Sequence, residues 1–210
     1  MTDWRQIRGE LFEDGFGYEI VHDTEHDVSD WADNRAFKIY ATSGAARHIP
    51  VDIVISEDDQ ETVDRLLSEA ACYLPLYLFV HSGVGVRTTP FGDPWDSGQC
   101  GFVALVNEHG YSWPENKDVL AEMLKGMVDE FDAVLRGQFV GWRVFTKRTC
   151  HACGNLDEKL LDSCFGYVVR DYGKDIDTIL NDEVLPMIEY ERKQLKEAEH
   201  ASRATAIGND

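Results

Sequence analysis

The stretch PWDSGQCGFVAL, residues 94–105, places a cysteine where its thiol could serve as a nucleophile. Cys100 follows an Asp-Ser-Gly turn and precedes an apolar run. A catalytic thiol needs a base, usually histidine, and donors that stabilise an oxyanion. The nearest candidate bases are His81, which precedes the cysteine, and His109, which follows it closely. The sequence therefore leaves a cysteine hydrolase as a hypothesis with an incomplete set of partners.

The same stretch suits a structural turn. Asp96 is expected to accept backbone N–H groups in an Asx turn, and Gly98 to take a positive φ. Trp95 is expected to anchor the loop on the core, and Gln99 to tie down a second loop. On this interpretation Cys100 is a small side chain facing the core.

The loop is also the predicted place for a ligand or partner. Two neighbouring strands would bring the His81-Ser82 turn to the same end of a sheet as residues 94–99. Asp96 and Ser97 form a polar pair, but a serine without a placed base is only a hydroxyl. The candidate binding residues are His81, Ser82, Trp95, Asp96, Ser97 and Gln99.

A second group of chemically active residues lies in TCHACGN. Cys150 and Cys153 have the C-x2-C spacing that binds one Zn²⁺ from a tight turn, and Cys164 is a third candidate ligand. A closed structural site needs four ligands, and no candidate for the fourth has a diagnostic spacing. Unmetallated structural thiols and a redox dithiol are the alternatives. The candidates for the fourth ligand are His151, Asp162 and His109.

Composition restricts the partners. The 210 residues include 39 acidic and 20 basic side chains, a formal net charge of -19, and 43% are hydrophobic. Such a chain can build a core, but it lacks the basic face that bare nucleic acid or an anionic membrane requires. A basic protein, including one that grips DNA, is compatible with this charge. The alternative is that the acidic surface only maintains solubility.

Nothing in the sequence predicts a membrane span or a signal peptide, and five cysteines do not suggest a disulfide framework. The expected location is the cytoplasm, which for a phage-encoded protein means that of the host cell.

Patterning predicts an α+β fold, a mostly antiparallel sheet packed by two or three helices, in one domain over residues 1–210. Strands are expected at 17–23, 36–42, 48–56, 73–81, 101–108 and 139–148, with Val51, Ile53 and Ile55 facing inward. Helices are expected after Ser56, from Pro114 to Gly137, and over 174–200 with a kink or break at Pro186. Residues 149–165 are expected to form a Cys-bearing loop, and 201–210 a frayed tail.

Several motifs between residues 78 and 173 together resemble an uncharacterised family of bacteriophage and mobile-element proteins. The matching segments are HSG at 81–83, TPF at 89–91, PWDSGQCG at 94–101, GQFVGW at 137–142, the C-x2-C, and DSCFG at 162–166. The resemblance implies a phage or mobile-element context and no activity. In that family the position of Cys100 is usually apolar, which argues against an essential nucleophile there.

Three functional hypotheses follow. The first is a non-enzymatic acidic protein that inhibits a host nucleic-acid-targeting defence system, of the anti-CRISPR or anti-restriction type, by occupying a basic nuclease or effector in place of nucleic acid. The second is an accessory protein with a structural zinc knuckle. The third is a cysteine hydrolase that uses Cys100.

Overall fold

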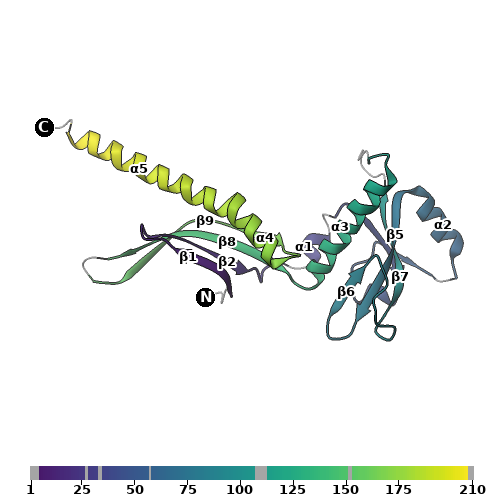
Figure 1. The fold of residues 1–210 in the computed structure, drawn as a ribbon. Helices are drawn as coiled ribbons and strands as arrows, with labels where there is room; N and C mark the ends of the chain where they lie inside the picture. The colour runs from purple at the N-terminus through teal and green to yellow at the C-terminus, as the bar shows by residue number, and fades with distance from the viewer. Residues whose placement is uncertain are drawn as a thin grey trace. The chain divides into compact units, whose positions relative to one another are not determined.

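The computed structural model describes residues 5–26, 28–32, 35–56, 58–106, 113–150 and 153–207. These residues form an α+β fold, as predicted, and they contain two mostly antiparallel sheets where the sequence suggested one (Figure 1). The chain divides into two compact units: unit 1 comprises Met1–Glu25 and Phe139–Asp210, and unit 2 comprises His26–Gln138. The single domain over residues 1–210 stays a prediction, because this division describes packing and not independent folding.

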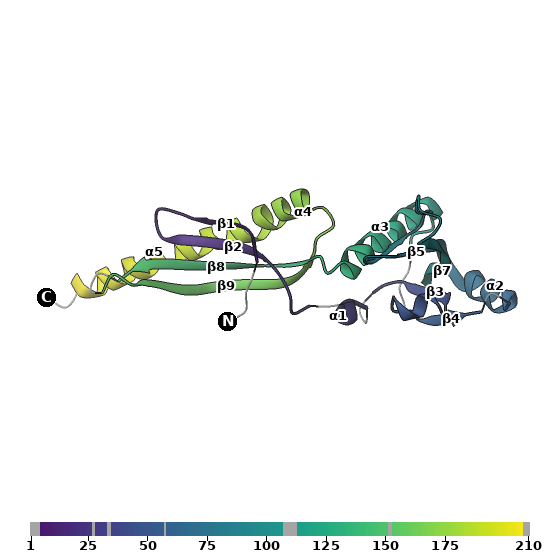
Figure 2. The same cartoon turned by 90° about the horizontal axis from the view of Figure 1, so that it is seen from below.

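Unit 1 is built from the two ends of the chain. Its sheet has the order β1-β2-β8-β9 and is antiparallel throughout (Figure 2). In β2 and β8 apolar side chains alternate, so one face of the sheet is buried. The strands are β1 (Gln6–Leu11), which the sequence analysis did not predict, β2 (Phe16–His22), β8 (Phe139–Thr149) and β9 (Leu156–Val168).

A helical segment covers that buried face. It consists of α4 (Tyr172–Ile179), a π-helical turn η2 (Leu180–Val184) and α5 (Leu185–Ile207). The carboxylate of Asp171 caps α4 by accepting the backbone N–H groups of Gly173 and Lys174. The expected interruption near Pro186 is present as this π-helical turn. The side chains that pack on the sheet are Ile176, Ile179, Leu180, Val184 and Ile188.

The helix extends further than the sequence suggested. α5 continues through Ile207, so residues 201–207 of the predicted tail are helical. That the tail frays stays a prediction, and residues 208–210 lie outside the described part. Arg192 of α5 holds the turn between β1 and β2: its Nε and Nη2 lie 2.7 and 3.0 Å from the two carboxylate oxygens of Asp14. The guanidinium also lies over the rings of Phe12 and Phe16, at 4.8 and 5.4 Å.

Unit 2 contains the second sheet, in the order β4-β3-β7-β5-β6, in which only the β3–β4 pair among the described residues is parallel. Its strands are β3 (Lys38–Thr42), β4 (Ile53–Ile55), β5 (Ala70–Val80), β6 (Val84–Arg87) and β7 (Ser97–Val106). Its helices are α1 (Val28–Ala32), the 3-10 turn η1 (Ala45–Arg47), α2 (Gln60–Glu69) and α3 (Lys117–Leu135).

The two faces of this sheet are covered differently. α3 packs Leu120, Leu124, Val128 and Phe131 against one face and forms the main core with it. On the other face α2 covers one end only, where Leu66 contacts Tyr40 and Ala104. Among the described residues, no helix has both the length and the apolar composition needed to cross a membrane.

Element boundaries differ from the predictions where capping chemistry decides them. α2 begins one turn later than expected, because Asp59 and not Ser56 accepts the N–H of Thr62. α3 begins after Asn116, so Pro114 precedes the helix. Ile53 was expected to face inward but is 39% exposed, because β4 is a short strand at the sheet edge.

Candidate partner-binding surface

The loop that enters β7 is held by Asp93. Its Oδ1 accepts the backbone N–H groups of Trp95 and Asp96 at 2.8 and 3.3 Å, and the hydroxyl of Ser97 donates to its carbonyl oxygen. The Asx turn predicted at Asp96 is therefore centred on Asp93, which the sequence analysis did not single out. The signal was present, because an aspartate before Pro-x-Asp-Ser is a typical turn initiator.

Asp96 instead pairs with His81. The imidazole Nδ1 lies 3.1 Å from Asp96 Oδ2, and the backbone N–H of Val80 donates to the Asp96 carbonyl at 2.9 Å. Antiparallel pairing of β5 with β7 brings the two turns together, as the sequence predicted. His81 and Ser82 are exposed.

This pair does not complete a catalytic triad. A carboxylate on Nδ1 would leave Nε2 to act as a base. Within the part of the chain that the structure describes, however, no hydroxyl or thiol is hydrogen-bonded to the His81 imidazole, and the Ser97 hydroxyl is directed to the Asp93 carbonyl. The arrangement fixes the orientation of His81 at the surface.

The rest of the motif is β-strand. Gly98 pairs with Leu78 and the exposed Gln99 pairs with Tyr77. Gly98 does not have the positive φ that was predicted, because it continues β7 and does not form the turn.

Cys100 is an unpaired bulge residue, since Leu76 pairs with Gly101 and Tyr77 with Gln99. Its thiol is buried and donates to the Leu76 carbonyl oxygen at 3.4 Å. Burial raises the pKa of the Cys100 thiol to about 11. A thiol that is buried and protonated at neutral pH is a poor nucleophile, so the geometry favours the core-facing role. The candidate base His109 lies outside the described residues.

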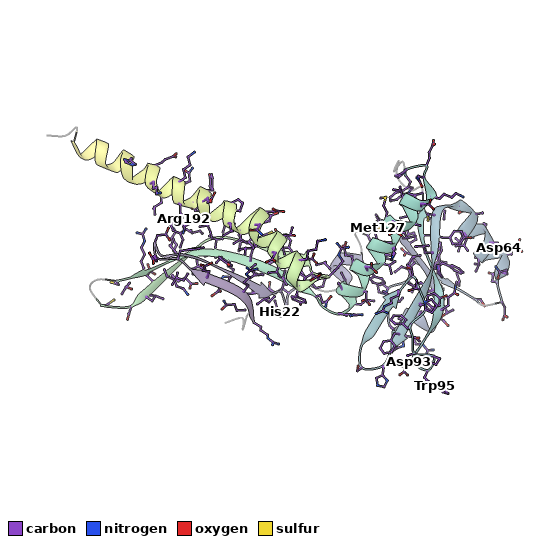
Figure 3. All side chains as sticks on the ribbon, viewed as in Figure 1. His22, Asp64, Asp93, Trp95, Met127 and Arg192 are labelled. Atoms are coloured by element: carbon purple, nitrogen blue, oxygen red, sulfur yellow. The ribbon has the colours of Figure 1, made fainter. Side chains whose placement is uncertain are left out.

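Trp95 is 91% exposed, so the prediction that it anchors the loop on the core is wrong (Figure 3). The hydrogen bonds to Asp93 fix its backbone, and the indole stands in solvent. Tryptophan is among the residue types most enriched in the hot spots of protein interfaces, and an exposed tryptophan on a fixed backbone is a candidate for such a contact.

Further aromatic side chains lie on the face of the sheet opposite α3. Tyr73, Tyr77 and Phe79 alternate with the core-facing leucines of β5, and Phe102 of β7 contacts the Tyr73 ring edge-on at 6.2 Å. Tyr73 is 48% exposed. Phe91, from the loop after β6, lies 5.6 Å from the Phe79 ring. We call these five residues the aromatic face.

The end of this face near Trp95 also carries a cation. Arg87 of β6 pairs in the sheet with Tyr77, and its guanidinium lies 4.6 Å from the centre of the Phe91 ring. Tryptophan, tyrosine and arginine are the three residue types most enriched in interface hot spots.

Carboxylates lie at both ends of the aromatic face. Asp93 and Asp96 hold the Trp95 loop at one end of β5, while α2 leads into the other end. Figure 3 labels Asp64 on α2 and Trp95 at these two ends. Unit 2 as a whole has 19 acidic and 8 basic side chains in its sequence. The exposed carboxylates on and just before α2 are Asp58, Asp59, Glu61, Asp64 and Glu69.

The predicted Cys-bearing loop is shorter than expected. β8 and β9 form a long hairpin, and only residues 150–155 connect them. Cys150 and Cys153 are exposed at its tip, where Gly154, at φ +73°, donates to the Cys150 carbonyl oxygen at 2.8 Å. The tight turn around these two thiols is therefore present.

Cys164 does not join them. It pairs with Trp142, seven residues along β8 from Thr149, which is about 23 Å at the rise of a β-strand. Asp162 pairs with Val144, and its Oδ1 accepts the N–H of Ser163. The prediction that Cys164 or Asp162 is a ligand of a metal site at the hairpin tip is therefore wrong.

The other two candidates for the fourth ligand, His151 and His109, lie outside the described residues. Over the described ranges no three His, Cys, Asp or Glu side chains converge on a common point. Zinc binding by Cys150 and Cys153 stays a prediction, with two of the four ligands that a closed site needs.

The Asp-Ser-Cys-Phe-Gly element has a packing role that the sequence analysis missed. The Phe165 ring lies against Gly141 so closely that a Cβ there would meet it at 1.9 Å. Gly166, at φ +88°, donates its N–H to the buried carboxylate of Asp23 at 2.9 Å. Asp23, which follows β2, thereby forms a hydrogen bond with the part of β9 where its register with β8 shifts.

Comparisons with protein-family models, with curated proteins and with solved structures find no match to this chain.

Proposed function

We propose that this protein is a non-enzymatic binding protein whose unit 2 docks on a basic protein partner through Trp95 and the aromatic face. The exposed, rigidly held Trp95 is the observation that carries the proposal. When a partner covers the exposed indole, the complex is stabilised by about 25 cal/mol per Å² of apolar area removed from water. The fixed backbone lowers the entropic cost of binding.

The charge of the chain supports the partner class. The carboxylates at both ends of the aromatic face favour a cationic surface, and complementary charge accelerates association. A protein that normally holds nucleic acid offers such a surface. We therefore propose a host nuclease or CRISPR-type effector as the partner, inhibited because its nucleic-acid site is occupied. The phage or mobile-element resemblance of the motifs is consistent with that role.

A direct test measures binding and inhibition together. Purified protein is titrated against a panel of restriction nucleases and CRISPR effectors at 50 and 300 mM salt, with DNA cleavage as the second readout. We expect at least one partner whose cleavage is inhibited and whose affinity falls steeply with salt. Absence of binding to every panel member at low salt would exclude these partner classes.

Matched variants identify the surface. Trp95→Ala should weaken binding about 30-fold, the equivalent of about 2 kcal/mol for a hot-spot residue. Tyr190→Ala removes another exposed aromatic ring, 56% exposed and on α5 of unit 1, and should leave affinity unchanged. Asp64→Asn should mainly slow association. If the tryptophan and tyrosine variants bind alike, Trp95 does not belong to the docking surface.

A further inference from the structure

The end of the β8–β9 hairpin in unit 1 projects beyond the neighbouring strand, because the pairing of β2 with β8 stops at Thr146 (Figure 1). Cys150 and Cys153 are both exposed at this tip. Two backbone hydrogen bonds of 2.8 Å close the turn around them, from the Cys150 N–H to the Asn155 carbonyl oxygen and from the Gly154 N–H to the Cys150 carbonyl oxygen. Two thiolates at C-x2-C spacing on such a tight turn can bind the same metal ion.

One chain supplies only part of a thiolate metal site at this tip. Zinc in a structural site is four-coordinate and tetrahedral. In the part of the chain that the structure describes, no third His, Cys, Asp or Glu side chain joins the two thiols. Cys164, the other exposed cysteine of the hairpin, lies about 23 Å away along the strands. A closed site at the tip therefore needs two further ligands from elsewhere.

The hairpin end also presents apolar side chains to solvent. Leu156 and Leu160 of β9 are 62% and 49% exposed, and Leu156 pairs with the last residue of β8, directly beside the turn. Asp157 and Lys159, which alternate with these leucines, line a cavity together with residues of α5. The leucines therefore lie on the face of the hairpin that is turned away from α5. Exposed apolar side chains gathered in this way mark an interaction surface.

The local charge of the hairpin end permits two copies of the chain to meet there. The formal net charge of -19 on the whole chain opposes self-association. Residues 145–160, in contrast, contain three basic and two acidic side chains. The exposed leucines can therefore be covered by a second copy at a place where the excess of carboxylates is absent.

We propose that the hairpin tip binds one Zn²⁺ shared between two copies of this chain, with Cys150 and Cys153 of each copy as the four ligands and with the exposed leucines at the contact. The four thiols release their protons to solvent, and the four thiolates complete the tetrahedral site. Two-fold symmetry makes the contributions of the two copies equivalent. The site belongs to unit 1 and shares no residue with the docking surface around Trp95, so either can fail without the other.

Metal content and molar mass together test the shared site. Zinc-free, full-length protein is titrated with zinc sulfate in the presence of a phosphine reductant, which prevents disulfides between chains. We expect the molar mass from light scattering to double at about one zinc per two chains, and EDTA to reverse the change. A monomer that holds one zinc, a chain that binds no zinc, or a dimer that EDTA does not dissociate would each overturn the proposal.

Cysteine variants locate the ligands. Cys150→Ser and Cys153→Ser should each abolish the zinc-dependent dimer, whereas Cys164→Ser, which removes an exposed thiol from the same hairpin, should retain it. Because both proposed ligands are exposed in a turn, their variants should keep the melting temperature of the unsubstituted protein when zinc is absent. Equal dimerisation of Cys153→Ser and Cys164→Ser contradicts the site.

Leucine variants test the contact beside the metal. Leu156→Ser should raise the dissociation constant of the zinc-bound dimer about tenfold, because one apolar side chain per copy is no longer buried. Leu11→Ser, at a position of β1 that is 53% exposed, should leave that constant unchanged. If the two variants dimerise alike, the leucines are not at the contact and this part of the proposal is wrong.

Discussion

Replacing Gly101 with alanine tests the close approach of two strands in unit 2. A Cβ at Gly101 would lie 2.0 Å from the Tyr40 carbonyl oxygen and 2.6 Å from the Ala41 Cα, both backbone atoms of β3. Ordinary contact begins at 3.4 Å, so β3 must move by about 1.4 Å or lose its pairing with β7. A matched control exists three residues earlier, because a Cβ at Gly98 meets nothing within 4 Å.

We expect Gly101→Ala to lower the free energy of unfolding by about 3 kcal/mol, the upper part of the range for overpacked interiors. The corresponding fall in melting temperature is about 6–12 °C for a chain of this size. Gly98→Ala should change it by less than about 2 °C. Scanning calorimetry measures the transition, and hydrogen exchange of residues 38–42 and 101–106 shows where protection is lost.

This reasoning is refuted if Gly101→Ala and Gly98→Ala have the same melting temperature and β3 keeps its protection from hydrogen exchange in Gly101→Ala. That outcome would mean that β3 and β7 can separate at this point without cost, and that the glycine is not required by the fold.

Four other predictions concern a buried carboxylate, an ion pair and the thiols. Asp23→Ala should cost about 3 kcal/mol of unfolding free energy in urea, because the N–H groups of Glu25 and Gly166 lose their acceptor, whereas Asp23→Asn, which keeps one acceptor oxygen, should cost less. Arg192→Met should cost about 1 kcal/mol near neutral pH. The hydrogen bonds from Arg192 lower the pKa of Asp14 below 3.8, so this difference should disappear as the pH falls below that value, and a constant difference down to pH 2 would contradict the assignment. In thiol labelling of the zinc-free protein followed by mass spectrometry at pH 7.5, Cys150 and Cys153 should react at once and Cys100 only after unfolding. Because burial raises the pKa of Cys100 to about 11 in the folded state, stability should decline as pH rises from about 9 toward 11, and this decline should be absent in Cys100→Val.

Alternation and periodicity in the sequence identified most elements. The apolar stripe from Leu120 to Phe131 predicted α3, and FVGWRVFTKR predicted β8, because each element must bury one face on a core. The α+β class followed from the same patterns. β1 was missed because its residues are almost all exposed, so QIRGEL carries no apolar alternation.

The candidate site was predicted in part. The sequence placed the His81-Ser82 turn at the same end of the sheet as residues 94–99, because neighbouring antiparallel strands bring their turns together, and the structure adds the His81–Asp96 pair. It assigned the wrong aspartate to the Asx turn and the wrong environment to Trp95. Both errors concern side-chain directions that depend on where β7 begins, and that point is set by pairing with β5.

The sequence by itself determined the acidic charge, the fold class and the turn around Cys150 and Cys153, since these depend on composition and on neighbours along the chain. Only the tertiary structure decided that Cys164 lies about 23 Å from that turn, that Trp95 stands in water, and that Leu156 and Leu160 are exposed beside the hairpin tip. Strand register and the approach of distant segments set these distances, and residue spacing in a sequence does not encode them.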